Sequence, residues 1–120
     1  MKVYIAHSSQ FDYKNKLYKP LRASKLNEEH ELFFPQDGKG EELSRHVIEE
    51  GDALVAEVSA PSLGTGIEMG WADAAGVPVI AMYEEWDTPS FSIDHVVTER
   101  FSYESPEDMV RKLAAALEKI

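Results

Sequence analysis

A glutamate behind a glycine-containing turn is the residue of this chain whose type and spacing best suit catalysis. Glu68 stands two residues after Gly66, which ends the segment from Pro61 to Gly66, PSLGTG. This spacing predicts that Glu68 lies in the first turn of a helix that begins near Gly66. A carboxylate at that place can attack an anomeric carbon or stabilise an oxocarbenium-like transition state. A first-turn glutamate also stabilises the positive end of a helix dipole, so the spacing alone leaves both interpretations open.

Two further polar loops are expected to share one edge of a sheet with this turn. They run from His7 to Gln10 and from Tyr83 to Ser92, and each follows an apolar run typical of a buried strand. In an open parallel sheet, ligands bind outside the carboxyl ends of the strands. Gly64 and Gly66 let a backbone approach a ligand closely, and the N–H groups of a helix start can hold a phosphate. The sequence therefore predicts a ligand site at this edge, and a small anionic ligand is compatible with it.

Strand and helix patterns alternate along the whole chain. Short β-rich runs predict strands at residues 3–6, 31–34, 53–58 and 77–83, with a last short strand within 96–103. Helical spacing predicts helices at 11–24, 41–50, 66–75 and from Ser105 onward, with Pro20 ending or kinking the first near Lys19. This order is typical of parallel βαβ units. We expect one α/β domain over residues 1–120, a doubly wound parallel sheet of about five strands with helices on both faces, as in flavodoxin-like and Rossmann-like folds.

Acidic residues outnumber basic ones in this chain, and the resulting charge limits the classes of partner that it can bind. There are 22 acidic and 12 basic residues, which give a formal net charge of −10. Such a surface repels a phosphate backbone, so we expect no nucleic-acid partner. Cysteine is absent, and His30, His46 and His95 show no metal-ligand spacing, so we expect no metal site. We expect no organic cofactor either. No apolar run reaches the roughly 20 residues of a membrane span. Because the first residues have the pattern of a strand rather than a signal peptide, we expect a cytoplasmic protein.

The segment from Asp52 to Ala72, DALVAEVSAPSLGTGIEMGWA, resembles the signature of the nucleoside 2-deoxyribosyltransferase family. This family includes the 2'-deoxynucleoside 5'-phosphate N-hydrolases. Its signature is a strand that begins at Asp, a Pro-Ser-x-Gly loop, and then Gly-x-Glu-[Leu/Met]-Gly-x-Ala. The resemblance implies a small-molecule nucleoside or nucleotide as ligand, and cleavage of its N-glycosidic bond by hydrolysis or base transfer. It also implies a homodimer whose sites are completed across the interface.

The resemblance assigns roles to individual positions. Glu68 falls on the family's nucleophile, and Tyr4 falls on a first-strand tyrosine that contacts it. The positions that fall on the loops holding the 5' end of the sugar are Ser62 and Gly64, with Gly66 beside them, the phosphate-loop residue Ser8, and a late serine, Ser92. The serine form of the main loop resembles the hydrolases that bind a 5'-phosphate.

Two positions depart from the family pattern. The family usually has an Asp eight residues before the strand Asp, where it helps to position the base and to transfer a proton to it, and here that place is Ser44. Glu41 lies one turn earlier and either substitutes for that Asp or is a solvated acid. His7 stands where the family has small residues, and it is either a proton carrier or a polar residue satisfied by loop backbone. Two hypotheses follow: an N-glycosidase or transferase, or a non-catalytic nucleotide-binding or sensing module of the same fold.

Two further residues have more than one interpretation. Glu57 lies among apolar residues in a predicted strand, where a carboxylate needs a partner, so it is a salt-bridged structural acid or part of the site. Trp86 lies in a loop, where it is a candidate for covering a base or for meeting a partner subunit.

Overall fold

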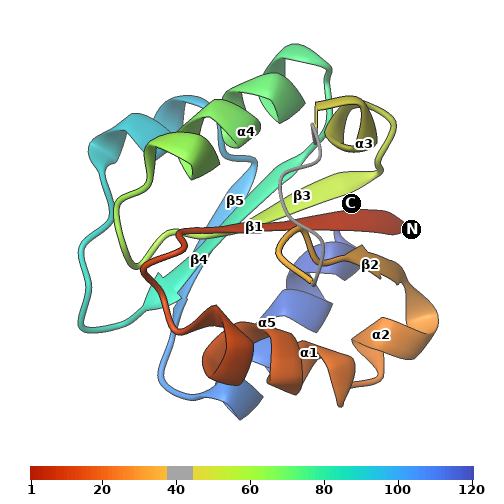
Figure 1. Ribbon diagram of the computed structural model, residues 1–120, viewed down its shortest axis with the longest axis vertical. Coiled ribbons are helices and arrows are strands. Elements are labelled where there is room, and N and C mark those ends of the chain that lie inside the picture. Colours follow the sequence, from red (N-terminus) through yellow and green to blue (C-terminus); the bar gives the residue numbers. More distant parts are fainter. Residues whose placement is uncertain (38–44) are drawn as a thin grey trace.

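The computed structural model describes residues 1–37 and 45–120, and in these residues it contains one parallel five-stranded sheet (Figure 1). The strands lie in the order β2-β1-β3-β4-β5, and all neighbouring strands are parallel. Their bounds are β1 Lys2–His7, β2 Glu31–Phe33, β3 Ala53–Glu57, β4 Val79–Glu84 and β5 Glu99–Tyr103. This order confirms the predicted doubly wound α/β fold.

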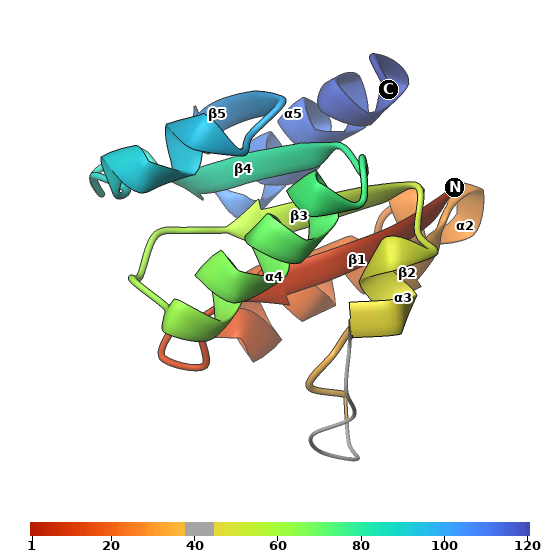
Figure 2. The same ribbon diagram turned by 90° about the horizontal axis from the view of Figure 1, so that it is seen from above.

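Helices cover both faces of the sheet. Their bounds are η1 Lys14–Tyr18 (a π-helix), α1 Lys19–Arg22, α2 Leu26–Glu29, α3 Arg45–Glu49, α4 Leu63–Ala74, η2 Phe91–His95 (a 3-10 helix) and α5 Pro106–Glu118. Figure 1 shows α1, α2 and α5 on one side of the sheet and α3 and α4 on the other. Figure 2 shows α4 lying over the central strands, and it contacts β1, β3 and β4.

The core has two layers because successive strand residues point to opposite faces of a sheet. Val3 and Ile5 of β1 are buried in the layer of α1 and α5. Tyr4 and Ala6 are buried in the layer of α3 and α4. The position of a side chain along β1 therefore decides which layer it enters.

The first helical segment changes geometry just before Pro20. The Lys19 N–H donates to the carbonyl of Lys14, five residues back, so the chain forms a π-helix at this point. Proline has no N–H and crowds the carbonyl four residues before it, and π-turns often mark such disturbances in a helix. The predicted disruption near Lys19 is confirmed, and it takes the form of a switch from π-helix to α-helix. The short helix α2 was not predicted from the sequence.

The helix that carries Glu68 begins three residues earlier than predicted. Ser62 is its N-cap, and the Ser62 Oγ accepts a hydrogen bond from the Thr65 N–H at 3.1 Å. This cap satisfies an otherwise free N–H at the helix start, so Gly64 and Gly66 are helical rather than parts of a loop. The predicted start near Gly66 is therefore wrong. Glu68 lies in the second turn, beyond the first turn in which a helix dipole chiefly acts.

The other predicted boundaries lie close to the observed ones. Gly76 follows α4 with a φ of 75°, the left-handed conformation that ends many helices and favours glycine. Ser105 caps α5 as predicted, with its Oγ accepting from the Asp108 N–H at 3.1 Å. The helix predicted over residues 41–50 is described only from Arg45, as α3. Glu41 and Ser44 lie outside the described residues.

Candidate active site

The structure brings Tyr4 and Glu68 into contact, although they are 64 positions apart in the sequence. Tyr4 comes from β1 and is buried, and its hydroxyl donates a hydrogen bond to Oε2 of Glu68 on α4. Glu68 is half-buried. Burial raises the pKa of its carboxyl group, and the hydrogen bond from Tyr4 partly opposes this rise. The result is a desolvated carboxylate with one oxygen held by a neutral donor.

His7 lies in the other layer of the core. Its ring stacks on Tyr13, and its Nε2 lies 2.7 Å from the Tyr18 hydroxyl. Its Nδ1 lies 3.0 Å from the Ser8 carbonyl, which can only accept, so Nδ1 carries the proton and Nε2 accepts from Tyr18. Burial lowers the pKa of His7, and the bond to the Ser8 carbonyl opposes this. These contacts favour a neutral histidine satisfied by its surroundings over a proton carrier.

A cavity of about 540 Å³ lies between the start of α4 and the segment that follows β4. Three of the sequence-predicted site residues, Ser62, Gly66 and Ser92, line it. Glu68 does not line it, but Ile67 and Met69 on either side of Glu68 do. Glu68 therefore lies next to the cavity on α4 without forming part of its lining.

Ser8 and Gly64 lie at the same edge of the sheet as the cavity but do not line it. Ser8 directly follows β1, is buried, and its Oγ accepts from the Gln10 N–H at 3.0 Å. Gly64 is helical, and a Cβ there would lie 3.9 Å from the Ser62 Oγ. Ser8 is thus enclosed by its own loop, whereas Gly64 leaves room beside the helix start.

Thr65 is a site residue that the sequence did not single out. Its side chain is only 4% exposed and lines the cavity, and among the described residues its Oγ1 has no hydrogen-bond partner. Buried hydroxyl groups are nearly always hydrogen-bonded in folded proteins, so an unpaired one beside a cavity indicates a polar ligand. The threonine between two glycines was the only sequence signal available.

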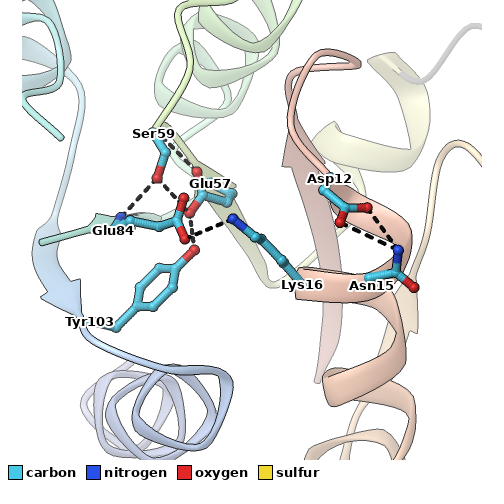
Figure 3. Close-up of polar contacts among 7 residues, drawn as sticks. All are labelled: Asp12, Asn15, Lys16, Glu57, Ser59, Glu84 and Tyr103. Carbon is cyan, nitrogen blue, oxygen red and sulfur yellow. Dashed lines mark hydrogen bonds and ion pairs between the residues drawn. The ribbon is translucent and has the colours of Figure 1, made fainter. Parts of the chain in front are cut away.

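Glu57 ends β3 and is held by three neutral donors (Figure 3). Its Oε1 accepts from the Ser59 N–H at 2.6 Å, and its Oε2 accepts from the Ser59 hydroxyl at 3.0 Å and from the Tyr103 hydroxyl. Burial raises the pKa of Glu57 to about 7, although these hydrogen bonds oppose the rise. The sequence predicts that this buried acid needs a partner, and the structure supplies hydrogen bonds rather than a salt bridge.

Glu84, at the end of β4, completes this group. Its backbone N–H donates to the Ser59 hydroxyl oxygen at 2.8 Å, while its side chain forms an ion pair with Lys16 at 3.3 Å. Figure 3 shows Lys16 reaching Glu84 from η1. The positive charge of Lys16 is thus directed to Glu84, and the hydrogen bonds of Glu57 come from Ser59 and Tyr103.

Residues 1–37 and 45–120 contain neither a metal-binding cluster nor a membrane-spanning helix. No three His, Asp or Glu side chains there gather in a way that could hold a metal ion. No helix there is long and apolar enough to span a membrane.

Comparisons with known proteins give a consistent picture, although no family model matches the chain. Two curated relatives match, both named "Putative 2'-deoxynucleoside 5'-phosphate N-hydrolase 1". The relative from Syntrophotalea carbinolica is 53% identical over 38 residues, 32% of this chain and 27% of the relative. The relative from Thermofilum pendens is 38% identical over 76 residues, 59% of this chain and 53% of the relative. This chain is their homologue.

The N-hydrolase homologues confirm the family resemblance seen between Asp52 and Ala72, but the chain spans at most about half of their length, 53% of one and 27% of the other. Solved structures extend the likeness to nearly the whole fold. A CMP N-glycosidase from Clostridium botulinum covers 95% of this chain and 99% of its own, with 24% identity and a TM-score of 0.71. A 2-deoxyribosyltransferase from Bacillus psychrosaccharolyticus covers 91% and 90%, with 18% identity and a TM-score of 0.61. These structures have the same fold as this chain.

The raised pKa of Glu57 predicts how stability changes with pH. Between the ordinary value of 4.5 and about 7, the folded chain keeps a proton that the unfolded chain has lost. The free energy of unfolding should therefore fall as pH rises through this window, by up to about 3 kcal/mol from this group. Glu57→Gln removes the ionisation, so its stability relative to wild type should increase from pH 5 to pH 8 in urea unfolding.

The exposed Glu28 on α2 offers a matched control. Glu28→Gln should show the same stability difference from wild type at both pH values. A stability difference between Glu57→Gln and wild type that is also independent of pH would contradict the raised pKa of Glu57. Glu68 shifts in the same direction but is common to all three proteins, so it cancels in the comparison.

Proposed function

We propose that this protein cleaves the N-glycosidic bond of a nucleoside or nucleoside 5'-monophosphate, with Glu68 as nucleophile. The contact between Tyr4 and Glu68 carries the proposal, because it joins the two positions that the family resemblance pairs. The names of the homologues, N-hydrolase, and of the structural neighbours, N-glycosidase and deoxyribosyltransferase, support the same reaction class.

The proposed reaction has two steps. One carboxylate oxygen of Glu68 bonds to C1' as the C1'–N bond breaks, and the base leaves with that electron pair and takes up a proton. Water then attacks C1', which releases Glu68 and gives hydrolysis, or a second base attacks and gives transfer. Tyr4 orients Glu68 by holding Oε2, which leaves Oε1 for the attack. The burial that raises the pKa of Glu68 also removes water that would otherwise shield the nucleophile.

The cavity beside α4 is proposed to receive the 5' end of the substrate. The hydroxyl groups of Ser62, Thr65 and Ser92 line it, and the N-terminus of α4 adds its N–H groups and positive dipole end. Together they suit a phosphate despite the net charge of −10. Gly66 lines the cavity where a side chain would narrow it, and Ser8 and Gly64 lie at the same edge of the sheet.

The direct test is release of free base. The protein is incubated with deoxyribonucleoside and ribonucleoside 5'-monophosphates, and base is quantified by chromatography. Wild type should release base from at least one of them. Glu68→Gln removes the nucleophile but keeps the side-chain shape, and it should lower the rate about a thousandfold or more. The exposed Glu118, at the end of α5, supplies the control Glu118→Gln, which should retain the wild-type rate.

Other outcomes separate the two hypotheses drawn from the sequence. Binding of a nucleotide without release of base would contradict the enzyme and support a non-catalytic binding or sensing module, in which Ser44 stands where relatives carry the helix Asp. Absence of both binding and release would contradict both.

The contact between Tyr4 and Glu68 also predicts a change in pH dependence. The hydrogen bond from Tyr4 lowers the pKa of Glu68, so Tyr4→Phe should raise that pKa further. Since the nucleophile must be ionised, the acid limb of kcat at saturating substrate should move to higher pH. Base release should then fall more at pH 5 than at pH 8.

Tyr83→Phe is the matched control for this substitution, because the Tyr83 hydroxyl is bonded to Arg100 on β5 instead. It should leave the acid limb in place. An acid limb that stays fixed in Tyr4→Phe, or moves to lower pH, is incompatible with the proposed contact.

A homodimer is proposed as the working assembly. Leu63 and Phe91 are each 84% exposed and Trp86 is 63% exposed, and Leu63 lines the mouth of the cavity while Phe91 stands next to Ser92. Exposed apolar side chains grouped around a site usually mark an interface. A second copy of the chain would cover this patch and bring its own polar loop to the cavity.

Light scattering tests the dimer. Wild type should have twice the 13.5 kDa mass of one chain, and Phe91→Asp should shift it toward that single mass. Ile120 is also apolar and 43% exposed, but it lies at the end of the chain, so Ile120→Asp should remain dimeric. A wild-type protein that stays monomeric at every concentration rules the dimer out.

A further inference from the structure

Glu57 is a carboxylate in a buried position, where its transfer out of water disfavours folding. It is 1% exposed at the end of β3, and the other four residues of that strand are apolar. Removing a carboxylate from water is unfavourable even when it is hydrogen-bonded, and an apolar residue of similar size is often at least as stable. Packing alone therefore does not explain why an ionisable carboxyl group stands at position 57.

The hydrogen-bond donors to Glu57 show which residue it fixes in place. Two of the three belong to Ser59, the N–H at 2.6 Å and the hydroxyl at 3.0 Å. The third donor is the hydroxyl of Tyr103 on β5, in the core layer of α1 and α5, and it holds the carboxylate of Glu57 in place. Glu57 thus clamps the backbone and the side chain of Ser59 at the same time.

Ser59 in turn connects the two walls of the cavity. Its hydroxyl donates to Glu57 and accepts from the Glu84 N–H at 2.8 Å, so both of its hydrogen-bonding directions are used. Residues 59–62 lead from this point to the cap of α4 and form one wall, and residues 88–90, after the end of β4, form the other. Just before Ser59, the Val58 N–H donates to the Met82 carbonyl at 2.8 Å as β3 and β4 end their pairing, so Ser59 is the side chain that continues the link between the two segments beyond the sheet.

We propose that Glu57 is a positioning residue that sets the width of the cavity through Ser59 and thereby the affinity for the 5' end of the substrate. This inference rests on the proposed function, because that function places the 5' end in the cavity. Glu57 does not touch the substrate: its two oxygens already accept three hydrogen bonds. Its effect is on binding of the 5'-phosphate rather than on attack by Glu68.

Glu57→Gln is the informative substitution. The amide has one accepting oxygen and a nitrogen that can only donate, so it cannot accept from all three groups. At least one bond to Ser59 or Tyr103 is lost while the side-chain volume stays the same. Urea unfolding of Glu57→Gln at the assay pH, as in the stability test above, separates a loss of folding from a change in the cavity.

Steady-state base release from a nucleoside 5'-monophosphate gives the first measurement. Glu57→Gln should raise KM about tenfold, because Ser59 and the cavity wall that follows it are no longer held in place, and leave kcat within about twofold. Ser59→Ala, which loses both hydroxyl bonds, should raise KM similarly. The double variant should be no worse than the single ones, because both remove the same connection. Glu28→Gln, on exposed α2, should match wild type.

Backbone amide hydrogen exchange gives a second measurement that needs no substrate. Exchange at Ser59 and Glu84 should be faster in Glu57→Gln than in wild type, while amides of β1 and α5 keep their rates. Unchanged exchange at both amides overturns the proposal. So does a fall in kcat at constant KM.

The two proposals fail in different ways. If wild type releases no base from any nucleotide, the proposed function is wrong, and the exchange rates at Ser59 and Glu84 alone decide the role of Glu57. If wild type releases base but KM does not change in Glu57→Gln, the function stands and the positioning role is wrong.

Discussion

The hydrogen bond from the Tyr4 hydroxyl to the Glu68 carboxylate joins the first strand to α4, and the geometry of the candidate site depends on it. Tyr4 is buried between the sheet and α4, so its hydroxyl reaches Glu68 only because α4 lies close over β1. The Ser62 cap fixes where α4 begins and hence which helix residue faces Tyr4. A shift of one residue in that start would turn Glu68 away by about 100°.

The buried Glu57 and the half-buried Glu68 lie on opposite faces of the sheet and have different hydrogen-bond partners. Among the described residues, Glu68 on the α4 side accepts a hydrogen bond from Tyr4, and the proposed attack uses its other oxygen. Glu57, on the side of α1 and α5, has three donors that leave no free direction toward a substrate. Desolvation raises the pKa of both groups. The number of donors, rather than burial, therefore distinguishes the proposed nucleophile from the proposed positioning residue.

Much of this arrangement could be predicted from local patterns. The alternation of strands and helices predicts the sheet, and the family resemblance pairs Tyr4 with Glu68. The start of α4 was misplaced because the glycines suggested a loop, whereas a serine cap decides where a helix begins. Tyr103, the donor that reaches Glu57, is 46 residues away on the strand at the far edge of the sheet, and no spacing rule connects the two. Contacts of this kind follow from strand order, which only the folded chain shows.

The role of Glu68 as a nucleophile is tested most directly by trapping the covalent intermediate. Wild-type protein reacting with a nucleoside 5'-monophosphate that it cleaves is quenched in acid, and its mass and peptides are measured. A sugar phosphate attached to Glu68, and absent from Glu68→Gln, is the predicted result. Base release that persists in Glu68→Gln, or an adduct on a different residue, would contradict the central claim.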